Sequence, residues 1–154
     1  MSWFYLLLKF IHVMAAITAV GSNITYAIWN VRASQEPSHT GFVLKVIKFI
    51  DDRIANPAYI VLLVTGLLMI AVGHLSITSL WILVALVLFV VLAVLGFGFY
   101  TPTLRDQIKE LGAGAGETVS AEFGRLARRS RMLGMAMGLV VVVIVVMMVF
   151  QPTL

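Results

Sequence analysis

Cysteine is absent from the 154 residues, so the chain forms no disulfide and offers no thiolate as a nucleophile or metal ligand. Charged residues are scarce at 12%, whereas hydrophobic residues make up 61% and the mean hydropathy is +1.04. A soluble domain carries about a quarter charged residues, and a disordered chain has low hydrophobicity. Both classes are therefore excluded, and the composition indicates a polytopic membrane protein.

Four apolar stretches are long enough to cross about 30 Å of hydrocarbon. Each is expected to be a helix, because backbone groups in lipid must be paired within their own segment. We predict one all-α membrane domain over residues 1–154, an antiparallel four-helix transmembrane bundle with spans 4–29, 57–73, 79–100 and 132–150. No basic residue precedes the first span, and Lys9 and His12 interrupt it, so we interpret it as a retained helix rather than a cleaved signal peptide.

Basic residues are unevenly distributed along the chain. Only Lys9 lies inside a span, and the turn between the second and third spans has none. The remaining Lys and Arg residues all lie in segments 30–56 and 101–131: Arg32, Lys45, Lys48, Arg53, Arg105, Lys109, Arg125, Arg128, Arg129 and Arg131. By the positive-inside rule, both segments are cytoplasmic loops and both termini lie outside. The net charge of +4 is thus a topology signal, and no basic face with aromatic platforms indicates nucleic-acid binding.

The first loop is predicted to contain an interfacial amphipathic helix at residues 38–54, lying in the headgroup plane. The apolar side of its helical wheel holds Phe42, Val46, Phe49, Ile50 and Ile54, and the polar side holds Lys45, Lys48, Asp51 and Asp52.

In the second loop, Thr101-Pro102 is predicted to begin a short helix that ends at Leu111, and Gly112–Gly116 is expected to be a flexible joint. This joint lacks the preceding strand and the following lysine of a phosphate-binding loop, so it does not indicate nucleotide binding. From Thr118 the chain is expected to continue as one helix into the fourth span.

Polar residues within the membrane gather on the first span, and spans two to four hold no charged residue. At 100° per residue, one side of this helix carries Tyr5, Lys9, His12, Asn23, Tyr26 and Asn30, with Ala16 and Ala19 between them. This stripe is unfavourable against lipid, so it is expected to face the bundle interior, a partner or a water-filled cleft.

His12 is predicted to lie near mid-membrane, about 14 Å from the outer end. One interpretation is a hydrogen bond to a neighbouring helix, for instance to Thr65 in the second span. The other is a ligand or proton site, because neutral imidazole is a common ligand of haem iron. No second axial ligand is evident at this depth in one subunit, which leaves a His12–His12 pair across a dimer. Met147 and Met148 are interpreted as packing residues.

The fourth span contains Gly134 and Gly138 at a spacing that permits close helix packing. We expect these two glycines to form a helix contact, either within the bundle or between subunits.

Two segments carry a family resemblance. Tyr5-Leu-Leu-Leu-Lys9-Phe-Ile-His12-Val-Met-Ala-Ala, followed by Gly21, resembles the first helix of small bacterial membrane proteins. These include the copper-resistance D-type proteins, the small membrane protoporphyrinogen oxidase and an uncharacterised family of predicted four-span integral membrane proteins. The last is the most similar, because Leu126-Ala-Arg-Arg129-Ser-Arg-Met-Leu-Gly134, Met147-Met148 and Pro152 also match it.

The resemblance implies a bacterial cytoplasmic (inner) membrane location, and the oxidase's Lys-x-x-His pair implies haem b at His12. The oxidase's later intramembrane lysine has no counterpart in spans two to four, so the oxidase activity is not carried over.

Three hypotheses follow. The first is a non-catalytic integral membrane protein in the lipid bilayer, as a homodimer or a subunit of a larger membrane complex. The second is a haem-binding redox protein with His12 as axial ligand and Lys9, Tyr5, Asn23 and Tyr26 around the ligand. The third is a small solute or proton transporter, which ranks last because the spans show no inverted repeat.

Overall fold

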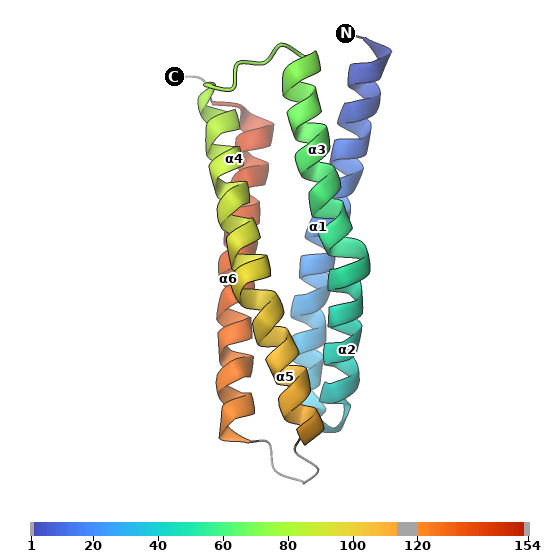
Figure 1. Ribbon diagram of the computed structural model, residues 1–154, viewed down its shortest axis with the longest axis vertical. Helices are drawn as coiled ribbons and strands as arrows, with labels where there is room; N and C mark the ends of the chain where they lie inside the picture. The colour runs from blue at the N-terminus through green and yellow to red at the C-terminus, as the bar shows by residue number, and fades with distance from the viewer. Residues whose placement is uncertain (1, 114–119, 153–154) are drawn as a thin grey trace.

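Four long antiparallel helical rods form the molecule, as the computed structural model describes for residues 2–113 and 120–152 (Figure 1). The first rod is α1 (Trp3–Gln35) and the fourth is α6 (Ala121–Phe150). The second runs through η1 (Pro37–His39), α2 (Thr40–Ile50), η2 (Asp51–Ala55) and α3 (Asn56–Val72), and the third through α4 (Leu80–Ala93), η3 (Val94–Tyr100) and α5 (Thr101–Ala113). The predicted all-α, four-span bundle is confirmed. Thr118 and most of the Gly112–Gly116 joint lie outside the described residues.

The rods are longer than a membrane is thick. The four candidate spanning helices have 33, 36, 33 and 30 residues, which corresponds to roughly 45–54 Å at 1.5 Å per residue. Hydrocarbon covers only about 30 Å, so part of the bundle projects beyond it. Figure 1 places both termini and the α3–α4 connection at one end, called the terminal end here. The opposite end, which includes α2, α5 and the first turns of α6, holds ten of the eleven Lys and Arg residues and is called the basic end.

Two π-helical segments allow the second and third rods to pass through prolines. Proline lacks an N–H, and its ring clashes with the carbonyl four residues earlier. For Pro57 that residue is Arg53, within η2, and for Pro102 it is Gly98, within η3. The wider turn of a π-helix separates ring and carbonyl, so the helix continues instead of breaking. The helices predicted at residues 38–54 and from Thr101 to Leu111 as separate from the spans are therefore parts of the continuous second and third rods.

The amphipathic helix predicted at residues 38–54 is present, but its orientation differs from the prediction. It does not lie across the bundle, because α2 continues through η2 into α3 and packs against α1 and α5. Its buried side holds Val43, Leu44 and Ile47. The predicted apolar side is turned outward, with Phe42 63% and Phe49 62% exposed.

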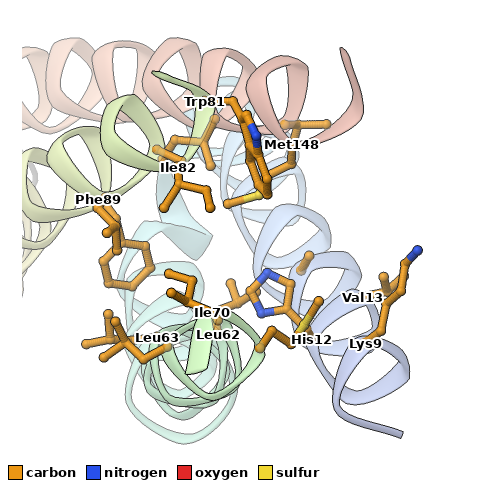
Figure 2. Close-up of a pocket in the computed structure, with 18 of the residues that line it drawn as sticks. Lys9, His12, Val13, Leu62, Leu63, Ile70, Trp81, Ile82, Phe89 and Met148 are labelled. Atoms are coloured by element: carbon orange, nitrogen blue, oxygen red, sulfur yellow. The ribbon is translucent and has the colours of Figure 1, made fainter. Parts of the chain in front are cut away.

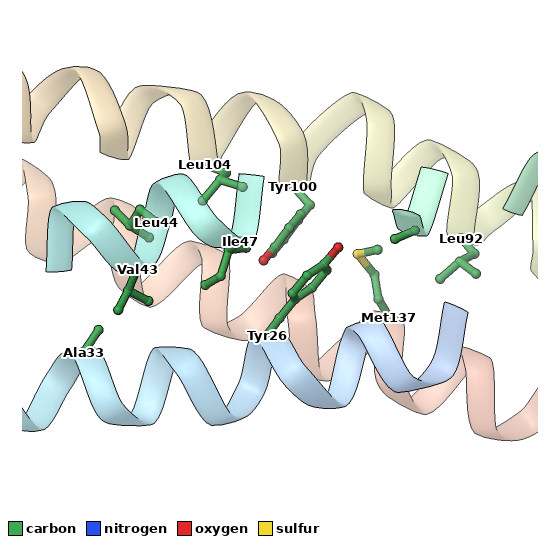
Figure 3. Close-up of a cluster of buried hydrophobic side chains, with 10 residues drawn as sticks. Tyr26, Ala33, Val43, Leu44, Ile47, Leu92, Tyr100, Leu104 and Met137 are labelled. Carbon is green, nitrogen blue, oxygen red and sulfur yellow. The ribbon is translucent and has the colours of Figure 1, made fainter. Parts of the chain in front are cut away.

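The hydrophobic core lies mainly toward the basic end (Figure 3). Stacked rings of Tyr26 and Tyr100, with centroids 6.4 Å apart, join the first and third rods. Around them lie Ala33, Val43, Leu44, Ile47, Ala55, Leu92, Leu104 and Met137. Toward the terminal end the bundle divides into two helix pairs. There α1 packs on α3 and α4 packs on α6. Between the pairs, α4 meets α3 through the edge-to-face contact of Phe89 with Tyr59, whose ring centroids are 6.3 Å apart.

Candidate functional site

A cavity of about 360 Å³ occupies the space between the two helix pairs. Its α1/α3 wall includes Tyr5, Lys9, His12, Tyr59 and Gly66. Its α4/α6 wall is almost entirely hydrocarbon and aromatic, and consists of Trp81, Ile82, Ala85, Leu86, Phe89, Leu92, Val141, Ile144, Val145, Met148, Val149 and the following Gln151. The cavity is thus an apolar chamber within the membrane, with few polar groups.

The stripe predicted on the first span faces this cavity along its first half. Tyr5 and His12 line the cavity together with Ala16 and Ala19. Lys9 also borders it, but its side chain is exposed and its amine points away from the chamber (Figure 2). The structure therefore brings Tyr5, Lys9 and His12 together, with Lys9 at the rim.

His12 is fixed by the hydrogen bond that its depth predicted. Its Nδ1 lies 2.8 Å from Oγ1 of Thr65, which is 6% exposed. The Thr65 hydroxyl donates its proton to the Val61 carbonyl at 2.6 Å. A hydroxyl has one proton, so it must accept from the imidazole, and Nδ1 carries the hydrogen. In neutral imidazole Nε2 then holds a free electron pair.

The carbonyl of Leu62 supports the same assignment, because it lies 3.3 Å from the Thr65 hydroxyl and is a second backbone acceptor for that hydroxyl's proton. A carbonyl only accepts hydrogen bonds, so the hydroxyl proton is directed to the backbone of α3 and the imidazole must donate to the hydroxyl oxygen. The ring is thereby anchored to α3 through one nitrogen.

Gly66 leaves room for this arrangement. A Cβ atom at this position would lie 3.3 Å from Cε1 of His12, which is tighter than most real contacts. The missing side chain lets the imidazole lie against the backbone of α3. Sequence reasoning missed Gly66, although its position directly after Thr65 in mid-span was a signal.

The other two predicted ligand-binding residues lie deeper than the cavity. Asn23 donates a hydrogen bond to the hydroxyl of Tyr59 at 2.6 Å, and only Tyr59 lines the chamber. Tyr26 is stacked in the core, and its buried hydroxyl has no hydrogen-bond partner among the described residues. Asn23 and Tyr26 therefore do not line this cavity, and the stripe divides into a cavity part and a core part.

Asp51 is a buried carboxyl that the sequence pattern placed on a polar surface. It lies just beyond the basic end of the second span, is 7% exposed, and accepts a hydrogen bond from Oγ1 of Thr101 at 3.3 Å. Burial raises the pKa of Asp51, and the Thr101 hydroxyl partly offsets this effect. The nearby Lys48 pairs with Asp52 instead. The carboxyl thus joins the second and third rods, distant from the cavity.

Gly134 and Gly138 make no close contact inside the bundle. A Cβ atom at either position would meet no heavy atom within 4 Å in the described chain. Packing within one subunit is therefore not the role of these glycines, and only the contact between subunits remains as a prediction.

A bare metal ion has no evident site. Within residues 2–113 and 120–152, no three His, Asp or Glu side chains lie close enough to hold one. A site at His12 would depend on a single imidazole from this chain and on ligands supplied by the bound group.

Comparisons with known proteins give a family and no function. No curated protein and no solved structure matches the chain. One family model matches residues 6–152, and it is described as a predicted integral membrane protein. This range includes all four rods except the first three residues of α1, and every residue of the cavity lining except Tyr5. The chain belongs to the DUF2269 family of predicted integral membrane proteins.

Proposed function

We propose that the protein binds haem b inside the membrane, with Nε2 of His12 as a ligand of the iron. The observation that carries this proposal is the Nδ1 hydrogen bond to Thr65, which leaves Nε2 with a free electron pair beside an apolar chamber. Haem-ligating histidines need this tautomer, and a hydrogen bond at the other ring nitrogen commonly fixes it.

The chamber fits this group chemically. Four ligands of a haem iron come from the macrocycle, so one protein imidazole is sufficient, whereas a bare ion needs several side chains. Hydrocarbon and aromatic walls, including Trp81 and Phe89, suit a flat apolar ring system. Tyr5 and Gln151 lie at the terminal-end rim, where they are placed to donate hydrogen bonds to the acidic groups of the ring. Bound there, haem supplies a one-electron redox centre.

The chain's own residues have distinct tasks in this proposal. Thr65 orients the imidazole, and Gly66 gives it space against α3. The α4/α6 wall excludes water from the side facing His12. Lys9, exposed at the rim, offers a positive charge without entering the chamber.

A purely structural role is the competing function. In that case the His12–Thr65 and Asn23–Tyr59 hydrogen bonds serve only to join α1 to α3, as polar bonds commonly do in membrane bundles. A transport path along Tyr5, Lys9, His12 and Asn23 has less support. The amide of Asn23 is bonded below the chamber, and the packed core lies beyond it.

Absorbance of the purified protein separates these functions. Detergent-solubilised wild-type protein, supplied with haemin, is expected to show a Soret band that His12→Ala lacks. His39→Ala removes an exposed histidine at the basic end and is the control that keeps the band. A folded wild-type protein that shows no Soret band of bound haem after haemin addition contradicts the proposal. The purely structural role is then the remaining function.

We also propose an orientation in the bacterial cytoplasmic membrane, with both termini outside. The asymmetry of Lys and Arg supports it, because ten of the eleven lie at the basic end. The chain has no cysteine, so single cysteines report accessibility cleanly. In intact cells, a membrane-impermeant maleimide should label Thr78→Cys in the α3–α4 connection and not Ser38→Cys at the basic end. The reverse labelling would overturn the orientation.

A homodimer through α6 is proposed as the assembly. Gly134 is exposed, and neither Gly134 nor Gly138 packs within the bundle, so this side of α6 can approach a second copy closely. Mild oxidation in membranes should crosslink Gly134→Cys into a dimer more efficiently than Leu139→Cys, which lies on another exposed side of α6. Equal or absent crosslinking of the two variants rejects the interface.

A further inference from the structure

We infer that the thioether sulfur of Met148 is the second protein ligand of the haem iron, on the face opposite His12. This inference rests on the proposed function. It names a partner for His12 within one subunit, where sequence reasoning found none and assigned Met148 to packing.

The position of Met148 carries the inference. Figure 2 shows His12 on the α1 side of the chamber, with Trp81 and Met148 pointing toward it from α4 and α6. A second axial ligand must approach from this opposite wall, because His12 and Thr65 already occupy the α1/α3 wall. Met69 also borders the cavity, but it belongs to α3 and lies on the wall of His12.

Elimination along the α4/α6 wall leaves one donor. Its side chains are hydrocarbon except for Trp81, Met148 and Gln151. An indole N–H only donates a hydrogen bond, so Trp81 offers no electron pair to a metal. Gln151 follows the end of α6 at the rim, and its amide oxygen is a hard donor of the kind that suits Mg²⁺ or Ca²⁺ rather than haem iron. Met148 is the side chain on this wall with a soft, polarisable sulfur of the kind that binds haem iron.

Methionine ligation has a defined consequence. A histidine–methionine pair raises the reduction potential of haem, as in the cytochromes c. It would also fill the sixth coordination position, so a bound iron would be low-spin and external ligands would have to displace the sulfur. Met148 would therefore direct the bound group toward electron transfer and away from the binding of small gaseous ligands.

The test compares optical and electron paramagnetic resonance spectra of haemin-loaded full-length variants in detergent. Wild-type protein should be six-coordinate and low-spin, with the near-infrared charge-transfer band of sulfur ligation. Met148→Leu should keep its haem through His12 but become predominantly high-spin, lose that band, bind carbon monoxide more readily and have a lower reduction potential. Met148→His should return to low-spin without the sulfur band, which also shows that the site is intact.

Met147→Leu is the matched control and should behave as wild type, and Met69→Leu should keep the sulfur band and the low-spin state. Met147 is the neighbouring residue outside the lining, and Met69 is the thioether on the His12 wall. A haem-loaded wild type that is high-spin, or a Met148→Leu variant that stays low-spin, overturns the Met148 assignment and leaves His12 ligation standing. A wild type that takes up no haem overturns both.

Discussion

Replacing Ile47 by alanine is expected to lower the free energy of unfolding by about 2–5 kcal/mol. Ile47 is 0% exposed and lies in the core between α2 and its neighbours at the basic end. Removing its side chain leaves a cavity that tightly packed surroundings fill only in part. This part of the bundle extends past the predicted span, so the lost burial is not replaced by lipid contact.

Phe49→Ala is the matched control for this prediction, because Phe49 lies two residues away on α2 and is 62% exposed. Its effect on stability should stay within about 0.5 kcal/mol. Denaturant unfolding of the detergent-solubilised variants, followed by circular dichroism, measures both values. If Phe49→Ala were the more destabilising change, α2 would lie with its aromatic side buried, and the continuous second rod would be incorrect.

Replacing Thr65 by valine is expected to weaken haem binding by about 10–100-fold, the usual effect of removing the group that orients a metal-ligating histidine. Valine keeps the shape of threonine but offers no acceptor to Nδ1 of His12. The imidazole would lose its preferred tautomer and its fixed orientation. Its N–H would also lack its hydroxyl acceptor in a medium without water to replace it.

Haemin titration of the solubilised protein measures this loss. Thr65→Ser retains a hydroxyl and should bind within a few-fold of wild type. Thr18→Val is the control for the loss of a threonine hydroxyl elsewhere on α1, because the Thr18 hydroxyl donates to the Met14 carbonyl of its own helix. Unchanged affinity in Thr65→Val would show that the hydrogen bond does not prepare His12 for a ligand.

The sequence predicted the spans and the His12–Thr65 contact for the same reason. Hydropathy locates the segments that cross the membrane, and the fixed rise of a helix then gives each residue a depth. His12 and Thr65 are at similar depths on adjacent spans. Polar side chains surrounded by lipid are expected to bond to each other, so these two were expected to be in contact. The contact is present at 2.8 Å.

The opposite wall of the cavity was not predictable in this way. Periodicity identifies a buried side only when polar residues mark the other side. Around Trp81 and Met148 the third and fourth spans are apolar on every side, so nothing in the pattern tells a cavity-facing residue from a lipid-facing one. These residues become recognisable only once the two helix pairs are placed in space.

The prediction of which side of α2 is buried was wrong for two physical reasons. This helix has two apolar sides, and the pattern gave more weight to the one with Phe42 and Phe49 than to the one with Ile47. The π-helical turn from Asp51 to Ala55 then changes the angle between successive side chains, so a wheel drawn at 100° per residue no longer applies. Asp51, assigned to the polar surface, is consequently buried.

The most direct test of the account is imidazole rescue in a His12→Gly variant. Without the imidazole, haemin added to the solubilised variant should give no protein-bound Soret band. Imidazole added to the buffer should restore the band, because it enters the space beside Gly66 and supplies the missing ligand. A His12→Gly variant that binds haemin as tightly as wild type, with a spectrum that does not respond to imidazole, would contradict the central claim that His12 is the iron ligand.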